Sequence, residues 1–241
     1  MTTGAAHAPP FDRIVFDCDS TLSSIEGIEE LSGEHKDEIA KLTRAAMAGE
    51  IPLEEVYGKR LEIVAPRRRA VATVGRRYIE TASPKAREVV SALKLLGKEV
   101  VVISGGLRLA VTAFAGWLGI DDAHVHAVKA FFDPDERIQG FDRNSPLARS
   151  GGKRDVLSAM PAARTAFVGD GMTDAEAREV VDCFICYQGH AAHPEVAALA
   201  HVVVPGPSFA DLLPVICSPD ELDMLRRDPR HGRLLVPPLS G

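Results

Sequence analysis

Carboxylates follow two apolar segments of this chain. Asp17 and Asp19 come directly after the run at residues 13–16, and Asp170 comes directly after the run at 165–169. Two unit charges about 4 Å apart repel by roughly 4 kcal/mol at an effective dielectric near 20, so the first pair requires a cation or a shared proton. Oxygen ligands without a cluster of cysteine or histidine favour magnesium. The sequence therefore predicts a Mg²⁺ site.

An anion is expected beside this metal, and a phosphate group suits the neighbouring residues. Ser104 offers a hydroxyl, while Gly105 and Gly106 allow backbone N–H groups to approach an anion closely before an expected helix. Lys153 lies at another expected helix start and would add a fixed positive charge. Lys129 is the second candidate for that charge, and we disfavour it because it lies within an expected strand.

Five short β-branched segments alternate with segments of helical pattern, at residues 13–16, 99–103, 165–169, 183–187 and 201–204. Strands that are apolar throughout predict a parallel sheet with helices on both faces. In such sheets, ligands bind beyond the carboxyl ends of the strands. We therefore predict an α/β fold, a doubly wound Rossmann-like sheet with Asp17, Ser104 and Asp170 at one edge.

The first and second predicted strands are about seventy residues apart, more than a simple crossover requires. Residues 24–86 have a mostly helical pattern, and we interpret them as an inserted helical cap. The core would then comprise 11–23 and 87–217, with a flexible N-terminus at 1–10. The C-terminal extension, 218–241, is polar and contains prolines, which is compatible with a docked arm or with disorder.

Residues 124–141 are expected to form a β-hairpin around Asp133, Pro134 and Asp135.

One helix of the predicted cap carries an arginine on its apolar face. Leu53, Tyr57, Arg60 and Val64 follow the i, i+4, i+7, i+11 spacing of one helical stripe. The arginine could extend to water, but an unpaired buried guanidinium is costly. This position therefore calls for an anion, either Glu26 or the carboxylate of a ligand.

The chain resembles the haloacid dehalogenase superfamily of phosphohydrolases and, within it, the phosphoserine phosphatases. The superfamily motifs occur in order as FDCDST, ISGG, SGGK and GDGMTD, at residues 16–21, 103–106, 150–153 and 169–174. Similarity to phosphoserine phosphatases extends to SSIEGIEEL, RAAMAGEIPLEEVYGKRL and GFDRNSPLARSGGK. The resemblance covers residues 11–215 approximately and implies a Rossmann-like core with a helical cap.

The resemblance implies catalysis through an aspartyl-phosphate intermediate. It assigns the nucleophile to Asp17 and the acid and base to Asp19. Mg²⁺ would be held by Asp17, the backbone carbonyl of Asp19, and Asp170. Ser104 and Lys153 would hold the phosphoryl oxygens.

Further site residues are also assigned by resemblance. Asp174 would steady the lysine and the metal-bound water, and Thr173 beside it is an acceptable variant of the family motif. Glu26 would bind the ammonium group and Arg60 the carboxylate of a small amino acid. The apolar lid of the substrate site would be formed by Met47 and Leu53.

The implied activity is magnesium-dependent hydrolysis of O-phosphoserine to serine and phosphate, a step of serine biosynthesis. The alternative is phosphotransfer, or hydrolysis of another small phosphate ester such as phosphohomoserine. A phosphorylated switch without turnover is disfavoured, because Asp19 supplies an acid–base group and Arg60 in a cap suits an enclosed small substrate.

Composition limits the binding partners and the cellular locations that we expect. The formal net charge of −6, from 28 basic and 34 acidic residues, provides no overall positive field, so nucleic acid is not expected as a partner. No apolar run reaches the ~18 residues that span a bilayer, and MTTGAAHAPP lacks the pattern of a signal peptide. We expect a cytoplasmic protein that binds a small phosphomonoester and no membrane, and that is a monomer or a homodimer.

Overall fold

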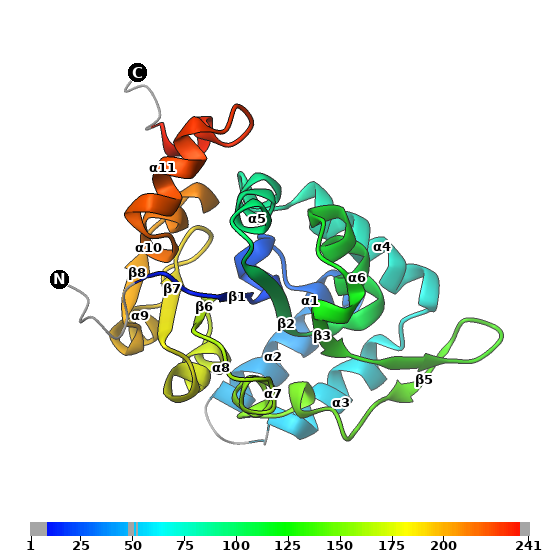
Figure 1. Cartoon of the computed structure of the whole chain (residues 1–241). Helices are drawn as coiled ribbons and strands as arrows, with labels where there is room; N and C mark the ends of the chain where they lie inside the picture. Colours follow the sequence, from blue (N-terminus) through cyan, green and yellow to red (C-terminus); the bar gives the residue numbers. More distant parts are fainter. Residues whose placement is uncertain (1–8, 48–50, 52, 237–241) are drawn as a thin grey trace.

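The computed structural model describes residues 9–47, 51 and 53–236, without the side chains of 40, 43–47 and 53. A six-stranded parallel sheet forms its centre, in the order β3-β2-β1-β6-β7-β8 (Figure 1). The strands are β1 Arg13–Phe16, β2 Glu99–Leu107, β3 Val125–Val128, β6 Thr165–Gly169, β7 Cys183–Tyr187 and β8 Val202–Val204. This arrangement confirms the predicted α/β fold.

The sequence of the central strands explains their position. Every residue of β1, β6 and β7 is buried, as expected for apolar strands covered on both faces. Six of the described helices from residue 86 onward pack around this sheet (Figure 1). They are α5 Ala86–Leu95, α6 Arg108–Leu118, α7 Gly152–Ser158, α8 Met172–Ala175, α9 Pro194–Leu199 and α10 Leu213–Ile216.

The segment that we interpret as a cap is helical. It contains α1 Gly27–Glu30, α2 Lys36–Met47, α3 Leu53–Val64 and α4 Arg68–Glu80. Its two connections to the sheet lie side by side, because Ser23 and Ala82 form an antiparallel bridge and the Ser24 N–H donates to the Thr81 carbonyl at 3.0 Å. The segment therefore leaves the core and returns to it at one place, and its role as a cap stays an interpretation.

The segment 124–141 differs from the prediction. The hairpin consists only of β4 Ala130–Phe132 and β5 Ile138–Phe141, and it projects from the body of the molecule (Figure 1). Residues 125–128 form β3 instead, which pairs in parallel with β2 at the edge of the main sheet. The hairpin turn at Asp133–Asp135 is present, but its predicted extent over residues 124–141 is wrong, because residues 125–128 pair with β2 instead.

The chain beyond residue 217 is a docked arm as far as the structure describes it. Helix α11, Pro219–Arg227, begins with a capping box between Ser218 and Glu221. Lys98 Nζ donates to Glu221 Oε1 at 2.6 Å and to the Phe11 carbonyl at 2.8 Å. These contacts decide between the two predicted possibilities for residues 218–236 in favour of docking.

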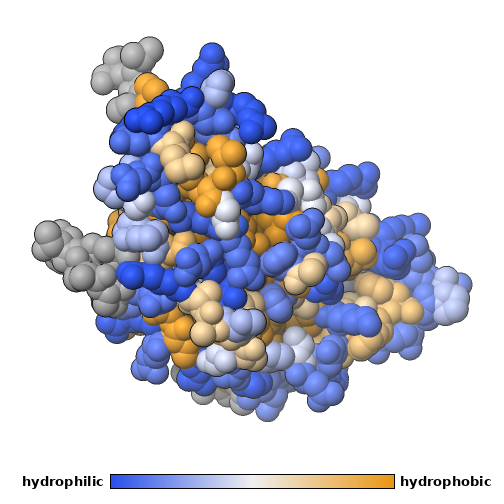
Figure 2. Space-filling model, in the orientation of Figure 1, coloured by the Kyte–Doolittle hydropathy of each residue, from blue (hydrophilic) through white to orange (hydrophobic). Residues whose placement is uncertain are grey.

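Hydrophilic residues cover most of the face shown in Figure 2, with small groups of hydrophobic residues between them. Within the described part of the chain, we find no helix with the length and apolar character needed to cross a membrane.

Candidate active site

The predicted metal and phosphate residues lie at one edge of the sheet. Asp17 follows β1 and Asp170 follows β6, and these strands are neighbours in register. Ser104 and Gly105 lie inside β2, which continues to Leu107, whereas the sequence predicted a strand end at residue 103. The ladder to β3 is irregular between Ile103 and Leu107, so the two glycines are accommodated in a distorted strand.

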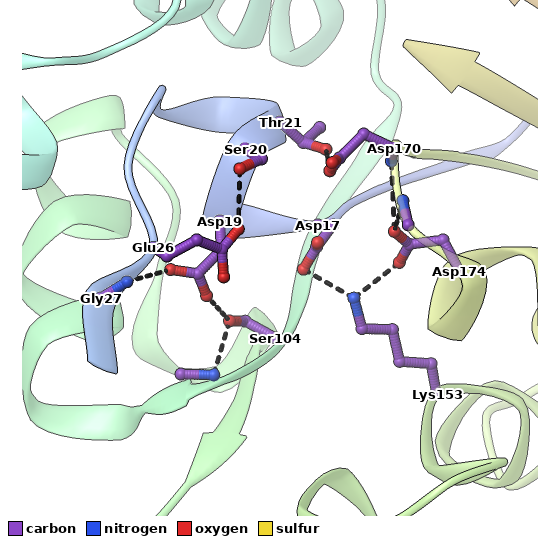
Figure 3. A network of polar contacts seen from close by, with 12 residues as sticks. Asp17, Asp19, Ser20, Thr21, Glu26, Gly27, Ser104, Lys153, Asp170 and Asp174 are labelled. Atoms are coloured by element: carbon purple, nitrogen blue, oxygen red, sulfur yellow. Dashed lines mark hydrogen bonds and ion pairs between the residues drawn. The ribbon is translucent and has the colours of Figure 1, made fainter. Parts of the chain in front are cut away.

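Lys153 links two of the carboxylates (Figure 3). Its Nζ lies 2.8 Å from Asp17 Oδ1 and 2.6 Å from Asp174 Oδ1, and all three side chains are buried. Burial lowers the pKa of Lys153, but attraction by Asp17 and Asp174 outweighs it and holds the pKa above its ordinary value. Gly152, at the start of α7, has no room for a Cβ, which would lie 1.8 Å from the Pro146 carbonyl oxygen. The backbone at the start of α7 therefore lies close to the Pro146 carbonyl, and this contact fixes the position of the helix turn that carries Lys153.

Asp174 also organises the loop that carries Asp170. Its Oδ2 accepts the backbone N–H groups of Asp170 at 3.2 Å and Gly171 at 2.9 Å. Its Oδ1 accepts from Lys153. These contacts are the ones expected of a residue that steadies the lysine, although its role in turnover stays a prediction. Thr173 lines the same cavity.

Asp17, Asp170 and Asp174 form an acidic cluster whose closest oxygens all lie within 4.8 Å of one another. Asp17 Oδ1 is a buried oxygen that has the ion pair but no hydrogen bond in the described structure. Burial, followed by repulsion from Asp174, raises the pKa of Asp17; the same two causes raise the pKa of Asp170 to about 6, although the Thr21 hydroxyl opposes the shift.

Hard carboxylate oxygens of this kind fit Mg²⁺. Asp17 and Asp170 are better placed as ligands than Asp174, because both oxygens of Asp174 already accept hydrogen bonds from Lys153 and the loop. The side chains of the predicted ligand set are thus together, and the assignment of metal ligands stays a proposal.

Asp19 points toward β2 and the cap segment and lies beside Ser104 in Figure 3. Its Oδ1 accepts the Tyr78 hydroxyl at 2.6 Å and the Gly27 N–H at 2.7 Å. Its Oδ2 accepts the Ser104 hydroxyl at 3.2 Å, and Ser104 Oγ accepts the Gly106 N–H at 2.9 Å. The carboxyl group is therefore held from both sides of the cavity.

Glu26 and Arg60 line the same cavity, which has a volume of about 270 Å³. Both residues are described, and they form no ion pair with each other, so the possibility that Glu26 neutralises Arg60 is wrong. Glu26 Oε1 instead accepts the Ser20 hydroxyl at 2.7 Å. Arg60 Nε is buried and has no hydrogen-bond partner in the described structure. This arginine therefore has capacity to bind an anion in the cavity.

Other predictions have different outcomes. Met47 and Leu53 belong to α2 and α3, but their side chains lie outside the described part of the structure. Lys129 lies between β3 and β4 rather than within a strand, and its Nζ lies 5.5 Å from the centre of the Phe131 ring. The cavity is lined by Lys153 and not by Lys129.

Two tyrosines were missed as site residues. Tyr57, on α3, donates its hydroxyl to the Gly105 carbonyl at 2.9 Å, and Tyr78, on α4, donates to Asp19. Tyr57 lies on the same helical stripe as Arg60, and this spacing could have indicated it. No sequence signal marks Tyr78.

A haloacid dehalogenase-like hydrolase model matches residues 11–182. The chain belongs to this family. It is 36% identical over 198 residues to the chloroplastic phosphoserine phosphatase of Arabidopsis thaliana, covering 78% of this chain and 67% of that protein. It is 34% identical over 191 residues to the human phosphoserine phosphatase, covering 77% of this chain and 85% of that protein. These relatives confirm the resemblance seen in the sequence.

A solved structure described as a phospho-aspartyl intermediate analogue of phosphoserine phosphatase superimposes with a TM-score of 0.69 at 25% identity, covering 86% of this chain and 100% of that one. This chain therefore shares the fold of that phosphoserine phosphatase over its full length. Because one relative is named chloroplastic, the expected cytoplasmic location stays a prediction.

Proposed function

We propose that the protein is a magnesium-dependent phosphatase that hydrolyses O-phosphoserine to serine and phosphate through an aspartyl-phosphate at Asp17. The observation that carries the proposal is a single cavity that contains the Asp17–Lys153 ion pair and the buried, unpartnered Nε of Arg60. The first suits a phosphate group and the second a carboxylate. The named activity of the relatives agrees with this combination. The reaction would serve serine biosynthesis.

Asp17 is the nucleophile in this proposal. One of its carboxylate oxygens bonds to phosphorus in line with the serine oxygen, whose bond to phosphorus breaks. Lys153 neutralises charge on the phosphoryl oxygens and the Ser104 hydroxyl orients them by a hydrogen bond, which matters because a loose transition state depends on placement and charge. Asp174 holds Lys153 in place through the 2.6 Å contact.

Asp19 is the acid and base. It gives a proton to the serine oxygen as that group leaves, so that neutral serine hydroxyl is released. It then accepts a proton from the water that attacks phosphorus, while the bond between phosphorus and Asp17 breaks. Asp17 is regenerated as a carboxylate and phosphate is the second product.

Mg²⁺ would be held by Asp17, the backbone carbonyl of Asp19, and Asp170, and when bound it supplies positive charge that offsets the clustered carboxylates and the phosphoryl group. Burial and then repulsion from Asp174 raise the pKa values of Asp17 and Asp170. A cation bound at this cluster would oppose both effects, which supports the assignment.

Recognition of the amino acid rests on two opposite charges. Arg60 would bind the substrate carboxylate with its guanidinium, and Glu26 would bind the ammonium group. Both residues line the 270 Å³ cavity, a size that suits a small substrate. Met47 and Leu53 remain the proposed apolar lid.

The direct test measures phosphate release from O-phosphoserine by the purified protein with Mg²⁺. Asp17→Asn should fold and lose activity by more than about 1,000-fold, since an amide is not a nucleophile. Mass spectrometry of acid-quenched protein should find the phosphoryl group on Asp17. The matched control is Asp135→Asn, on the exposed hairpin turn, which should retain full activity. Activity of Asp17→Asn close to that of the unmodified protein would refute the proposal.

A further inference from the structure

The hydroxyl of Tyr78, on helix α4, contacts Asp19, whose side chain lines the catalytic cavity. Tyr78 is fully buried, and its hydroxyl donates to Asp19 Oδ1 at 2.6 Å, a short distance typical of a hydrogen bond to a carboxylate. A phenol is protonated at neutral pH whereas a carboxylate only accepts, so Tyr78 is the donor in this contact.

The ring of Tyr78 is fixed without the help of its hydroxyl. It stacks on Phe114 of α6 with ring centres 5.5 Å apart and an angle of 20° between the planes. Phe114 in turn stacks on Trp117, with ring centres 6.0 Å apart. Aromatic packing of this kind places the hydroxyl at one position. The packing therefore fixes the ring whose hydroxyl contacts Asp19.

A glycine makes room for this hydroxyl. A Cβ on Gly27 would lie 2.0 Å from Tyr78 Oη. Any other residue at this position would therefore force the Tyr78 ring to move. The Gly27 N–H donates to the same Asp19 oxygen at 2.7 Å. Asp19 Oδ1 thus accepts two hydrogen bonds, from α1 and α4.

The two oxygens of Asp19 differ as a result. Two donors use the lone pairs of Oδ1, whereas among the described residues Oδ2 accepts only the Ser104 hydroxyl, at the longer distance of 3.2 Å. The geometry points to Tyr78 as a positioning residue that fixes the carboxyl group of Asp19 and leaves Oδ2 as the oxygen that exchanges protons with the substrate. This inference rests on the proposed function.

The proton balance follows the two steps of the proposed reaction. In the first, Oδ2 gives its proton to the serine oxygen as the Asp17–phosphorus bond forms and the serine–phosphorus bond breaks. In the second, Oδ2 takes a proton from the attacking water as the Asp17–phosphorus bond breaks. Tyr78 keeps its own proton throughout and acts only by holding Asp19.

The test removes the hydroxyl in Tyr78→Phe and compares two phosphate donors. O-phosphoserine has an alkoxide leaving group that needs a proton, whereas acetyl phosphate releases acetate, which needs none at neutral pH. We expect kcat and kcat/KM for O-phosphoserine to fall by about 10- to 100-fold with KM nearly unchanged, within the range of general acid catalysis. Phosphorylation of Asp17 by acetyl phosphate should slow by less than about 3-fold, because this step needs no acid.

Tyr187→Phe is the matched control. Tyr187 is also fully buried, but its hydroxyl donates at 3.0 Å to the carbonyl of Pro207, which does not line the cavity. This variant should leave both rates unchanged. Gly27→Ala provides a second variant that displaces the hydroxyl without removing it, and it should reproduce the selective loss on O-phosphoserine even if Tyr78→Phe does not fold.

An unchanged kcat in both Tyr78→Phe and Gly27→Ala would overturn the inference, and so would equal losses on the two donors. Failure of the proposed function gives a different result, because the unmodified protein would then release no phosphate from O-phosphoserine.

Discussion

At the scale of single residues, the cavity combines groups whose charges are not balanced within the chain. Arg60 Nε is buried and has no hydrogen-bond partner in the described structure, and such a group costs about 1–3 kcal/mol if it stays unpaired. A carboxylate in the cavity would remove this cost. The arginine therefore contributes to ligand affinity more than to stability of the free protein.

Arg60→Gln should raise the KM for O-phosphoserine by about 10- to 150-fold, since a hydrogen bond to a charged group contributes roughly 1.5–3 kcal/mol. O-phosphoethanolamine has the ammonium and phosphate groups but no carboxylate, and its KM should change by less than about 3-fold. Lys59→Gln, at the neighbouring exposed position, serves as the control and should leave both KM values unchanged. Equal increases for both esters would show that Arg60 does not bind the carboxylate.

The sequence predicted the charged residues of the cavity well and its tyrosines poorly. Asp17, Asp170 and Lys153 could be recognised because buried charges at strand and helix ends have few structural explanations. Tyr57 and Tyr78 look like core residues in the sequence, since an aromatic ring at helical spacing usually packs inside. The partner of a buried hydroxyl depends on which elements meet in the fold, and the chain alone does not show it.

At the scale of elements, Tyr57 connects the proposed cap to the sheet. Helix α3 contacts β2 through the Tyr57 hydroxyl and the Gly105 carbonyl, and the Tyr57 ring lies 5.0 Å from the ring of Phe141 in β5. Gly105 is also the predicted phosphate-binding position. The contact thus joins the helix that carries Arg60 to the strand that would hold the phosphate.

Tyr57→Phe should increase the local opening of α3. Loss of one buried hydrogen bond of about 1 kcal/mol corresponds to roughly a 5-fold rise in hydrogen exchange, provided that exchange occurs by local opening. Hydrogen–deuterium exchange of α3 peptides would measure this, with α5 peptides as the internal control that should not change. A uniform increase over both helices would indicate global destabilisation and contradict a role as a local connection.

The C-terminal arm depends on a largely buried ion pair. The side chain of Lys98 is 3% exposed and that of Glu221 is 19% exposed, and they are 2.6 Å apart. Glu221→Ala leaves a buried ammonium with only the Phe11 carbonyl as partner, so the free energy of unfolding should fall by about 2–4 kcal/mol. Urea unfolding would measure it. Asp220→Ala, an exposed acid in the same first turn, should cost less than about 0.5 kcal/mol; similar losses in both variants would argue against the ion pair.

The elements themselves could be predicted where the pattern was long and unbroken. Strands β1, β6 and β7 were found with their observed bounds because each is an apolar run between polar residues. The strand β3 was missed because four residues carry too little periodicity, and its pairing with β2 is set by tertiary contacts. Docking of residues 218–236 could not be predicted either, since it depends on Lys98, which is distant in the sequence.

At the scale of the whole molecule, the fold brings Asp17, after β1, close to Asp170 and Asp174, which follow β6, and places Lys153 against Asp17 and Asp174. Asp17 and Asp170 have raised pKa values, so the folded protein without metal binds protons at these sites more tightly than the unfolded chain. This contribution favours folding at low pH and is lost as the pH rises through about 6 for Asp170. Metal binding and global stability are therefore linked.

Mg²⁺ should stabilise the protein more at pH 8 than at pH 5. Protons compete with the metal for carboxylates when the pH is below about 6, the pKa of Asp170, whereas at pH 8 both Asp17 and Asp170 are more available as ligands. A metal present at about ten times its Kd adds about 1.4 kcal/mol, which corresponds to a rise in Tm of roughly 3–6 °C for a chain of this size. Thermal unfolding with Mg²⁺ and with EDTA at both pH values measures the effect, and Asp170→Asn should remove most of it. A rise in Tm that is equal at the two pH values, or that persists in Asp170→Asn, would mean that the metal binds elsewhere on the molecule.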